Sequence, residues 1–179
     1  MLRIQDCSLV VVDVQGKLAQ LMYEKEPLFK NIQILIKAVK ILQVPILWCQ
    51  QCPEALGPTV PEIARLLSAN EPINKASFSC WPNREFNDHL KSLSGNQVLI
   101  CGIETHVCIY QTAIDLLQAG YEVNVVADAV SSRTIENKNI GLEKIKAAGA
   151  KFTSTEMVIF ELLKTAEHPR FKEIVRLVK

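Results

Sequence analysis

Short runs of apolar, mostly β-branched residues alternate with longer stretches in which apolar residues recur every three or four positions. The short runs predict strands and the longer stretches predict helices. The predicted strands cover residues 8–14, 45–50, 96–102, 121–129 and 151–155, and the helices that follow them cover 27–43, 61–69, 106–119, 134–149 and 156–164. This alternation predicts an α/β fold with a mostly parallel, twisted, Rossmann-like sheet and helices on both faces.

Two further helices complete the predicted chain. One covers residues 84–93, after Pro82-Asn83, and an amphipathic segment over 168–179 is expected to dock on the domain or on another subunit. The chain has 179 residues and a hydrophobic content of 49%. That is enough for one sizeable core and too short for two ordinary domains, so we expect a single domain over residues 1–179.

The charge pattern narrows the classes of partner. Twenty basic and nineteen acidic residues leave a formal net charge of +1, without blocks of one sign. We therefore expect a small-molecule partner, and neither nucleic acid nor a membrane surface. The first residues, "MLRIQDCSLVVVDVQ", predict a strand and not a signal peptide. Six cysteines without a secretory signal fit a reducing compartment, so we expect the cytoplasm as the default, with an organelle matrix as the alternative.

Ligands of open parallel sheets collect beyond the carboxyl ends of the strands, which directs attention to the residues there. Asp13 ends the first predicted strand, where it is either a turn cap or a buried, paired acid. Asp128 lies at the end of the fourth predicted strand, where it is more simply explained as the start of a loop that leads to a helix cap at Thr134. Cys108 falls near the start of a helix. If Thr105 is the N-cap, the helix dipole should lower the pKa of this thiol. The alternative is a packed core cysteine.

A nucleophilic Cys108 needs a base, and the three histidines are poorly placed. His106 diverges from Cys108 on the helix, while His89 and His168 follow no strand. Asp13 is therefore the leading candidate for the base, and a nearby cation would support it. Lys75 lies in an irregular stretch between two predicted helices, where it is either that cation or a solvated surface lysine.

Three separated motifs, "VVVDVQ", "INKASFS" and "GIETHVCIYQTAIDLLQAGY", make the chain resemble the isochorismatase-like hydrolases, the cysteine hydrolase superfamily. The resemblance is greatest to family members of unassigned substrate. It implies a catalytic triad of Asp13, Lys75 and Cys108. It also implies a cis peptide between Ile103 and Glu104, and backbone N–H groups of Glu104 and Cys108 that hold an oxyanion. Gln15 and Thr105 are expected to orient their neighbours.

The resemblance also implies a reaction class. Nicotinamidases of this superfamily carry an Asp-x-His pair for a metal after the second strand, where this chain has "WCQQCP", so we expect no metal. The chain has no G-x-G-x-x-G or phosphate loop, so we expect no cofactor either. A nucleophilic cysteine favours hydrolysis of a small-molecule amide or related C–N bond through a thioester. The alternatives are isochorismatase-type hydrolysis and a non-catalytic or redox-thiol protein, the latter through Cys49 and Cys52. Family members usually form oligomers, and residues 156–179 offer apolar surface, so we expect a homo-oligomer.

Overall fold

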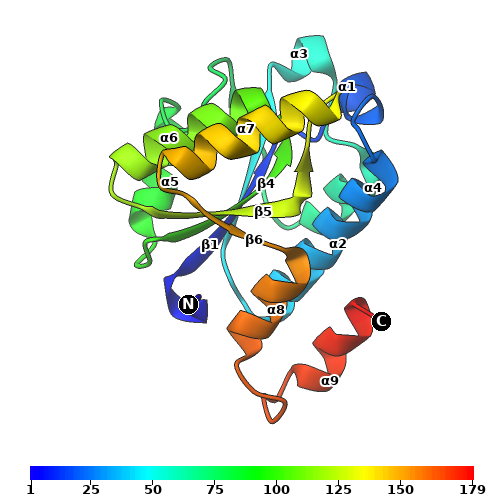
Figure 1. Ribbon diagram of the computed structural model, residues 1–179, viewed down its shortest axis with the longest axis vertical. Helices are drawn as coiled ribbons and strands as arrows, with labels where there is room; N and C mark the ends of the chain where they lie inside the picture. The colour runs from blue at the N-terminus through cyan, green and yellow to red at the C-terminus, as the bar shows by residue number, and fades with distance from the viewer.

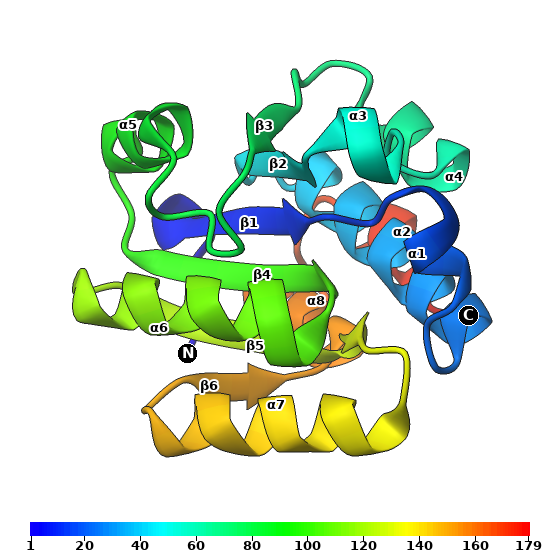
Figure 2. The same ribbon diagram turned by 90° about the horizontal axis from the view of Figure 1, so that it is seen from above.

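Six parallel strands form one sheet in the order β3-β2-β1-β4-β5-β6, in a computed structural model that describes residues 1–179 (Figure 1). The strands are β1 (Cys7–Val12), β2 (Ile46–Gln51), β3 (Ile73–Lys75), β4 (Gln97–Ile103), β5 (Glu122–Ser131) and β6 (Lys151–Thr153). The predicted α/β class with a parallel sheet is confirmed. Because all strands run in one direction, their carboxyl ends meet at one edge of the sheet (Figure 2).

Nine α-helices flank this sheet. They are α1 (Gly16–Gln20), α2 (Lys25–Ile41), α3 (Pro53–Leu56), α4 (Pro61–Ala64), α5 (Arg84–Ser92), α6 (Tyr110–Gln118), α7 (Ile135–Ala147), α8 (Thr155–Leu163) and α9 (Phe171–Ile174). The side chains of Asn83, Thr134 and Ser154 cap α5, α7 and α8 by accepting bonds from backbone N–H groups. Such caps satisfy donors that a helix start leaves free, and the predicted cap at Thr134 is confirmed.

Two hydrophobic cores lie on opposite faces of the sheet. Along β1, Leu9 and Val11 face the core shared with α2 and α8, whereas Val10 and Val12 face the core shared with α5, α6 and α7. Figure 1 shows α6 and α7 on one side of the strands and α2, α8 and α9 on the other. Every residue of β1 is therefore buried, which explains its continuous apolar sequence. No helix of the chain is long and apolar enough to cross a lipid bilayer.

Three local features differ from the prediction. Lys75 ends an edge strand, β3, and does not lie in an irregular stretch; a strand of three residues is too short to show a period. Asp128 lies within β5, whose pairing with β4 shifts near it, so it is not in a loop. A short helix, α3, which the sequence pattern did not predict, begins at Pro53 directly after Cys52, where proline is compatible with the first turn of a helix.

The C-terminal helices use most of their apolar surface within the domain. Val158, Ile159, Leu162 and Leu163 of α8 and Ile174 of α9 are buried in the α2 core. The predicted last helix is reduced to α9 and a following 3-10 turn, Val175–Leu177. Met157 and Phe160 remain exposed on α8. The apolar surface that suggested an oligomer is therefore smaller than the sequence indicated.

Gly141 of α7 provides a test of how closely α7 packs against the Cys108 segment. A Cβ atom at this position would lie 2.8 Å from the backbone nitrogen of His106, closer than real contacts allow. We expect Gly141→Ala to lower the free energy of unfolding by about 1–3 kcal/mol, although alanine favours helices, because the overlap involves backbone atoms. Urea unfolding measures this change. Asn139→Ala, on the exposed side of the same helix, is the matched control, and equal stabilisation by both variants would contradict the close packing.

Candidate active site

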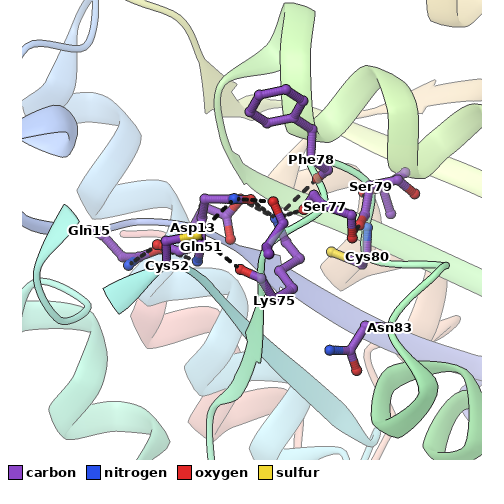
Figure 3. A network of polar contacts seen from close by, with 12 residues as sticks. Asp13, Gln15, Gln51, Cys52, Lys75, Ser77, Phe78, Ser79, Cys80 and Asn83 are labelled. Carbon is purple, nitrogen blue, oxygen red and sulfur yellow. Dashed lines mark hydrogen bonds and ion pairs between the residues drawn. The ribbon is translucent and has the colours of Figure 1, made fainter. Parts of the chain in front are cut away.

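The Lys75 ammonium lies among oxygen atoms at the carboxyl ends of β1, β2 and β3. Its Nζ donates to Asp13 Oδ2 and to Gln51 Oε1, each at 2.7 Å. It also contacts the carbonyl oxygens of Ser77 at 3.2 Å and Phe78 at 3.0 Å, as Figure 3 shows. The Lys75 side chain has no exposed surface and that of Asp13 is 3% exposed, so this ion pair is shielded from water. An ammonium has three N–H groups, so all of its donors are committed to the protein.

Strand register brings these residues together. Asp13 directly follows β1 and has a φ of 53°, a left-handed conformation that Asp adopts more readily than most residues. Its N–H donates to the carbonyl of Cys49 on β2 at 3.1 Å. Gln51 and Lys75 are paired residues at the ends of β2 and β3. Three neighbouring strands thus place an acid, an amide and a cation side by side.

Cys108 lies in a π turn, Thr105–Ile109, that connects β4 to α6. The expected N-cap at Thr105 is wrong: Glu104 occupies the N-cap position, and its carbonyl accepts a bond from the N–H of Ile109 at 3.2 Å. The wider turn explains why α-helical spacing misplaced the cap. The Ile103–Glu104 peptide bond is cis. Cys108 is 7% exposed and belongs to the core shared with α5, α6 and α7.

Burial controls the protonation of this site. It raises the pKa of the Cys108 thiol, and the negative charge of Asp13 raises it further, while Lys75 opposes both effects. Burial also raises the pKa of Asp13, against the effect of Lys75. The expected lowering of the Cys108 pKa is therefore wrong, because loss of hydration outweighs a helix dipole at so buried a thiol. Burial thus favours the neutral form of the Cys108 thiol, which lies next to the Lys75–Asp13 pair.

The two oxygens of Asp13 have different surroundings. Oδ2 accepts the bond from Lys75, whereas Oδ1 is buried and has no partner within hydrogen-bond geometry. The Cys108 thiol lies close enough to this carboxylate to affect its pKa. Asp13 therefore has an oxygen without a partner that can receive a proton, and the Cys108 thiol lies near this carboxylate.

Gln15 stabilises the same carboxyl end of the sheet through bonds to backbone groups. Its side chain is fully buried; Nε2 donates to the carbonyls of Gln51 at 3.0 Å and Gly57 at 2.8 Å, and Oε1 accepts from the N–H of Gln51 at 2.6 Å. These contacts orient the backbone of Gln51, and a role of Gln15 in the reaction stays a prediction. The hydroxyl of Thr105 is also buried, but it has no hydrogen-bond partner, so no bond supports the same role for Thr105.

The side chains of the remaining candidates make no bond to the Asp13 carboxylate or the Lys75 ammonium. His106 Nδ1 contacts Ser132 Oγ at 3.0 Å, and Asp128 Oδ1 accepts bonds from the N–H and hydroxyl of Thr155 at 2.8 and 3.0 Å. Cys49 is fully buried next to Cys80, which raises its pKa, and Cys52 is half-buried. All six thiols are free. No group of three or more His, Cys, Asp or Glu side chains is arranged to hold a metal ion.

Sequence reasoning missed Gln51, which contacts Lys75 as closely as Asp13 does. A signal was present, since a polar residue at the end of an apolar strand is costly to bury unless it is hydrogen-bonded. The side chain of Gln51 therefore needs a partner in the fold. Its partner could not be identified, because the strand that ends at Lys75 was not predicted.

Comparison with known proteins places the chain in a family. The model of the isochorismatase domain matches residues 7–157, so the chain belongs to the isochorismatase family, as its motifs predicted. A secreted isochorismatase effector of Phytophthora sojae is 39% identical over 175 residues, which cover 96% of this chain and 83% of the relative. The fold is that of the isochorismatase-like hydrolases.

Two solved structures show the same fold. The MAR1 ribonuclease of Caenorhabditis elegans is 36% identical, with a TM-score of 0.93 over 99% of this chain and 91% of the other. The YcaC gene product of Escherichia coli, described as an octameric hydrolase of unknown specificity, has a TM-score of 0.88 at 22% identity, covering 98% of this chain and 94% of the other. At this lower identity the likeness concerns the fold alone.

The pH dependence of Cys108 alkylation tests the link to Asp13. Proton transfer from Cys108 to Asp13 leaves the number of bound protons unchanged, so thiolate formed this way has a population independent of pH. We expect the rate of reaction with iodoacetamide to be flat across the neutral range and to fall when acid protonates Asp13. Because burial raises the pKa of Asp13, that fall begins at a higher pH than for an exposed Asp.

Peptide mapping after brief labelling measures the rate at each cysteine. In Asp13→Asn the flat region should disappear, and labelling of Cys108 should rise about tenfold per pH unit, as for any thiol below its pKa. Half-buried Cys52 is the internal reference. Identical profiles for Cys108 in the wild type and Asp13→Asn would contradict the proton transfer.

Proposed function

We propose that this protein is a cysteine hydrolase that cleaves a small-molecule amide or related C–N bond through the triad Asp13, Lys75 and Cys108. The observation that carries the proposal is the buried Lys75–Asp13 ion pair beside the Cys108 thiol. An ion pair removed from water costs several kcal/mol in lost hydration and is a weak source of stability. Its position against a thiol at the carboxyl edge of the sheet therefore supports a catalytic role.

The reaction begins with transfer of the Cys108 proton to Asp13. The sulfur then forms a bond to the carbonyl carbon of the substrate, and the backbone N–H groups of Glu104 and Cys108 stabilise the oxyanion. Protonated Asp13 donates its proton to the leaving amine as the C–N bond breaks, which leaves a thioester on Cys108. Water, activated by Asp13, hydrolyses the thioester and restores the thiol. Lys75 keeps its charge throughout and holds Asp13 in place.

The charge balance of the site favours an uncharged substrate. Lys75 is the only buried lysine or arginine of the chain, and its donors are occupied by protein oxygens. A substrate with several carboxylates, as isochorismatase-type chemistry requires, would meet no free cation among the buried groups. A neutral amide needs only the oxyanion donors and the thiol. The absence of a free buried cation and the presence of a thiol nucleophile therefore both favour amide hydrolysis over the isochorismatase alternative.

A screen of neutral amides and ureides tests this proposal. We expect turnover by the wild type and a loss of at least about 10³-fold in kcat for Cys108→Ala and Asp13→Asn, since each removes a group that reacts. A trapped acyl group on Cys108, seen by mass spectrometry, would identify the intermediate. Chelators should leave the rate unchanged, because the triad needs no metal.

The same screen includes a dicarboxylic vinyl ether and a short RNA, the latter because of the ribonuclease relative. Turnover of either compound that persists in Cys108→Ala would overturn the proposal. Turnover that a chelator abolishes would show that a metal takes part.

We also propose that this protein works in a reducing compartment, the cytoplasm or an organelle matrix. Its six free thiols support this proposal.

We further propose that the protein forms a homo-oligomer. The supporting observation is a surface hollow lined by Met1, Met157, Phe160, Glu161 and Lys164, in which the first three residues are 88%, 53% and 40% exposed. The octameric Escherichia coli hydrolase gives a precedent within the fold.

Light scattering at micromolar concentration measures the assembly. We expect a mass that is a multiple of 20.0 kDa, and we expect Phe160→Glu to reduce it because a charge would be buried in the contact. Lys164→Glu changes the charge at the margin of the hollow and is the control. A monomer mass for the wild type would refute the oligomer.

A further inference from the structure

We propose that Gln51 is a positioning residue: an uncharged acceptor that holds the Lys75 ammonium against Asp13. The proposal rests on the function proposed above and explains a contact that the reaction itself does not use. Figure 3 shows Gln51 beside Asp13, with Lys75 reaching both. Of the four oxygens around Nζ, the two side-chain oxygens lie closest, at 2.7 Å, and only one of these carries a charge.

The protein fixes the orientation of Gln51 from several sides. Its backbone N–H and C=O are both bonded to the side chain of Gln15, at 2.6 and 3.0 Å. Its side-chain Nε2 donates to the carbonyl of Ala76 at 2.6 Å. Since Nε2 must face that carbonyl, Oε1 must face Lys75. The amide is thus set before any substrate binds.

The same contacts explain why an amide occupies this position. A carboxylate would place a second anion next to Lys75 and would also face the carbonyl oxygen of Ala76, which repels it. The ammonium would then be shared between two acids, and Asp13 would hold a proton more tightly. Gln51 supplies a hydrogen bond without competing for charge, so Asp13 remains the one anion that Lys75 neutralises.

The preceding residue provides a matched control. Gln50 is 6% exposed and Gln51 is 8% exposed, and both belong to β2. The side chain of Gln50 donates to Thr59 Oγ1 at 3.1 Å and does not contact Lys75. A substitution of Gln50 therefore has a similar structural cost without affecting the ammonium.

The experiment measures labelling of Cys108 by iodoacetamide against pH, without substrate, in Gln51→Met, Gln51→Glu, Gln50→Met and Lys75→Met. The readout is the pH at which the flat region of the wild-type profile falls on the acid side. In Gln51→Glu this point should move upward by about one pH unit, a tenfold change in proton affinity. Gln51→Met should also move this point upward, but by less. The ammonium then loses the acceptor that holds it against Asp13, so it stabilises the carboxylate less well. Gln50→Met should leave the point unchanged. Circular dichroism establishes that each variant is folded.

The outcomes separate the two proposals. If Lys75→Met moves the profile but both Gln51 variants follow the wild type, the positioning role is wrong and the triad stands. If Gln50→Met moves the profile as far as Gln51→Met, the effect is structural and the positioning role is also wrong. If Lys75→Met leaves the profile unchanged, Lys75 does not act on Cys108, and the role of Gln51 is refuted together with the triad.

Discussion

The buried ion pair between Lys75 and Asp13 is the constraint on which the rest of the site depends. Removing one member of such a pair leaves an uncompensated charge and typically costs about 3–5 kcal/mol. The arrangement is stable only if the ends of β1, β2 and β3 stay in register, because these three strand ends carry Asp13, Gln51 and Lys75. The fold therefore serves the site chiefly by fixing three neighbouring strand ends.

The ion pair also sets the chemistry open to Cys108. A thiol that is 7% exposed, with a raised pKa, forms little free thiolate near neutral pH, so ionisation to bulk water is a poor route to a nucleophile. Transfer to Asp13 avoids that problem because the charge stays within the site, next to Lys75. Reactivity then depends on geometry more than on the pKa of the cysteine alone, as in other coupled pairs.

The same reasoning joins the family to its proposed substrate. Membership in the isochorismatase family establishes the fold and the hydrolase class. Within that class, a committed ammonium, a free carboxylate oxygen and a buried thiol suit acyl transfer from an uncharged amide. Gln51 completes the arrangement by accepting a bond from the ammonium with a neutral amide, and Gln15 holds the backbone of Gln51 in place.

The sequence by itself determined the sheet and pointed to the residues that are proposed to react. Continuous apolar runs such as β1 and β4 predicted buried parallel strands, and the motifs around Asp13, Lys75 and Cys108 predicted the triad residues, two of which form a direct ion pair. Only the tertiary structure decided the strand at Lys75, the partner of Gln51 and the direction of the Cys108 pKa shift. Each of these depends on contacts between strands distant in sequence and on burial, and neither hydrophobic period nor helix position measures how much water a folded chain removes from one thiol.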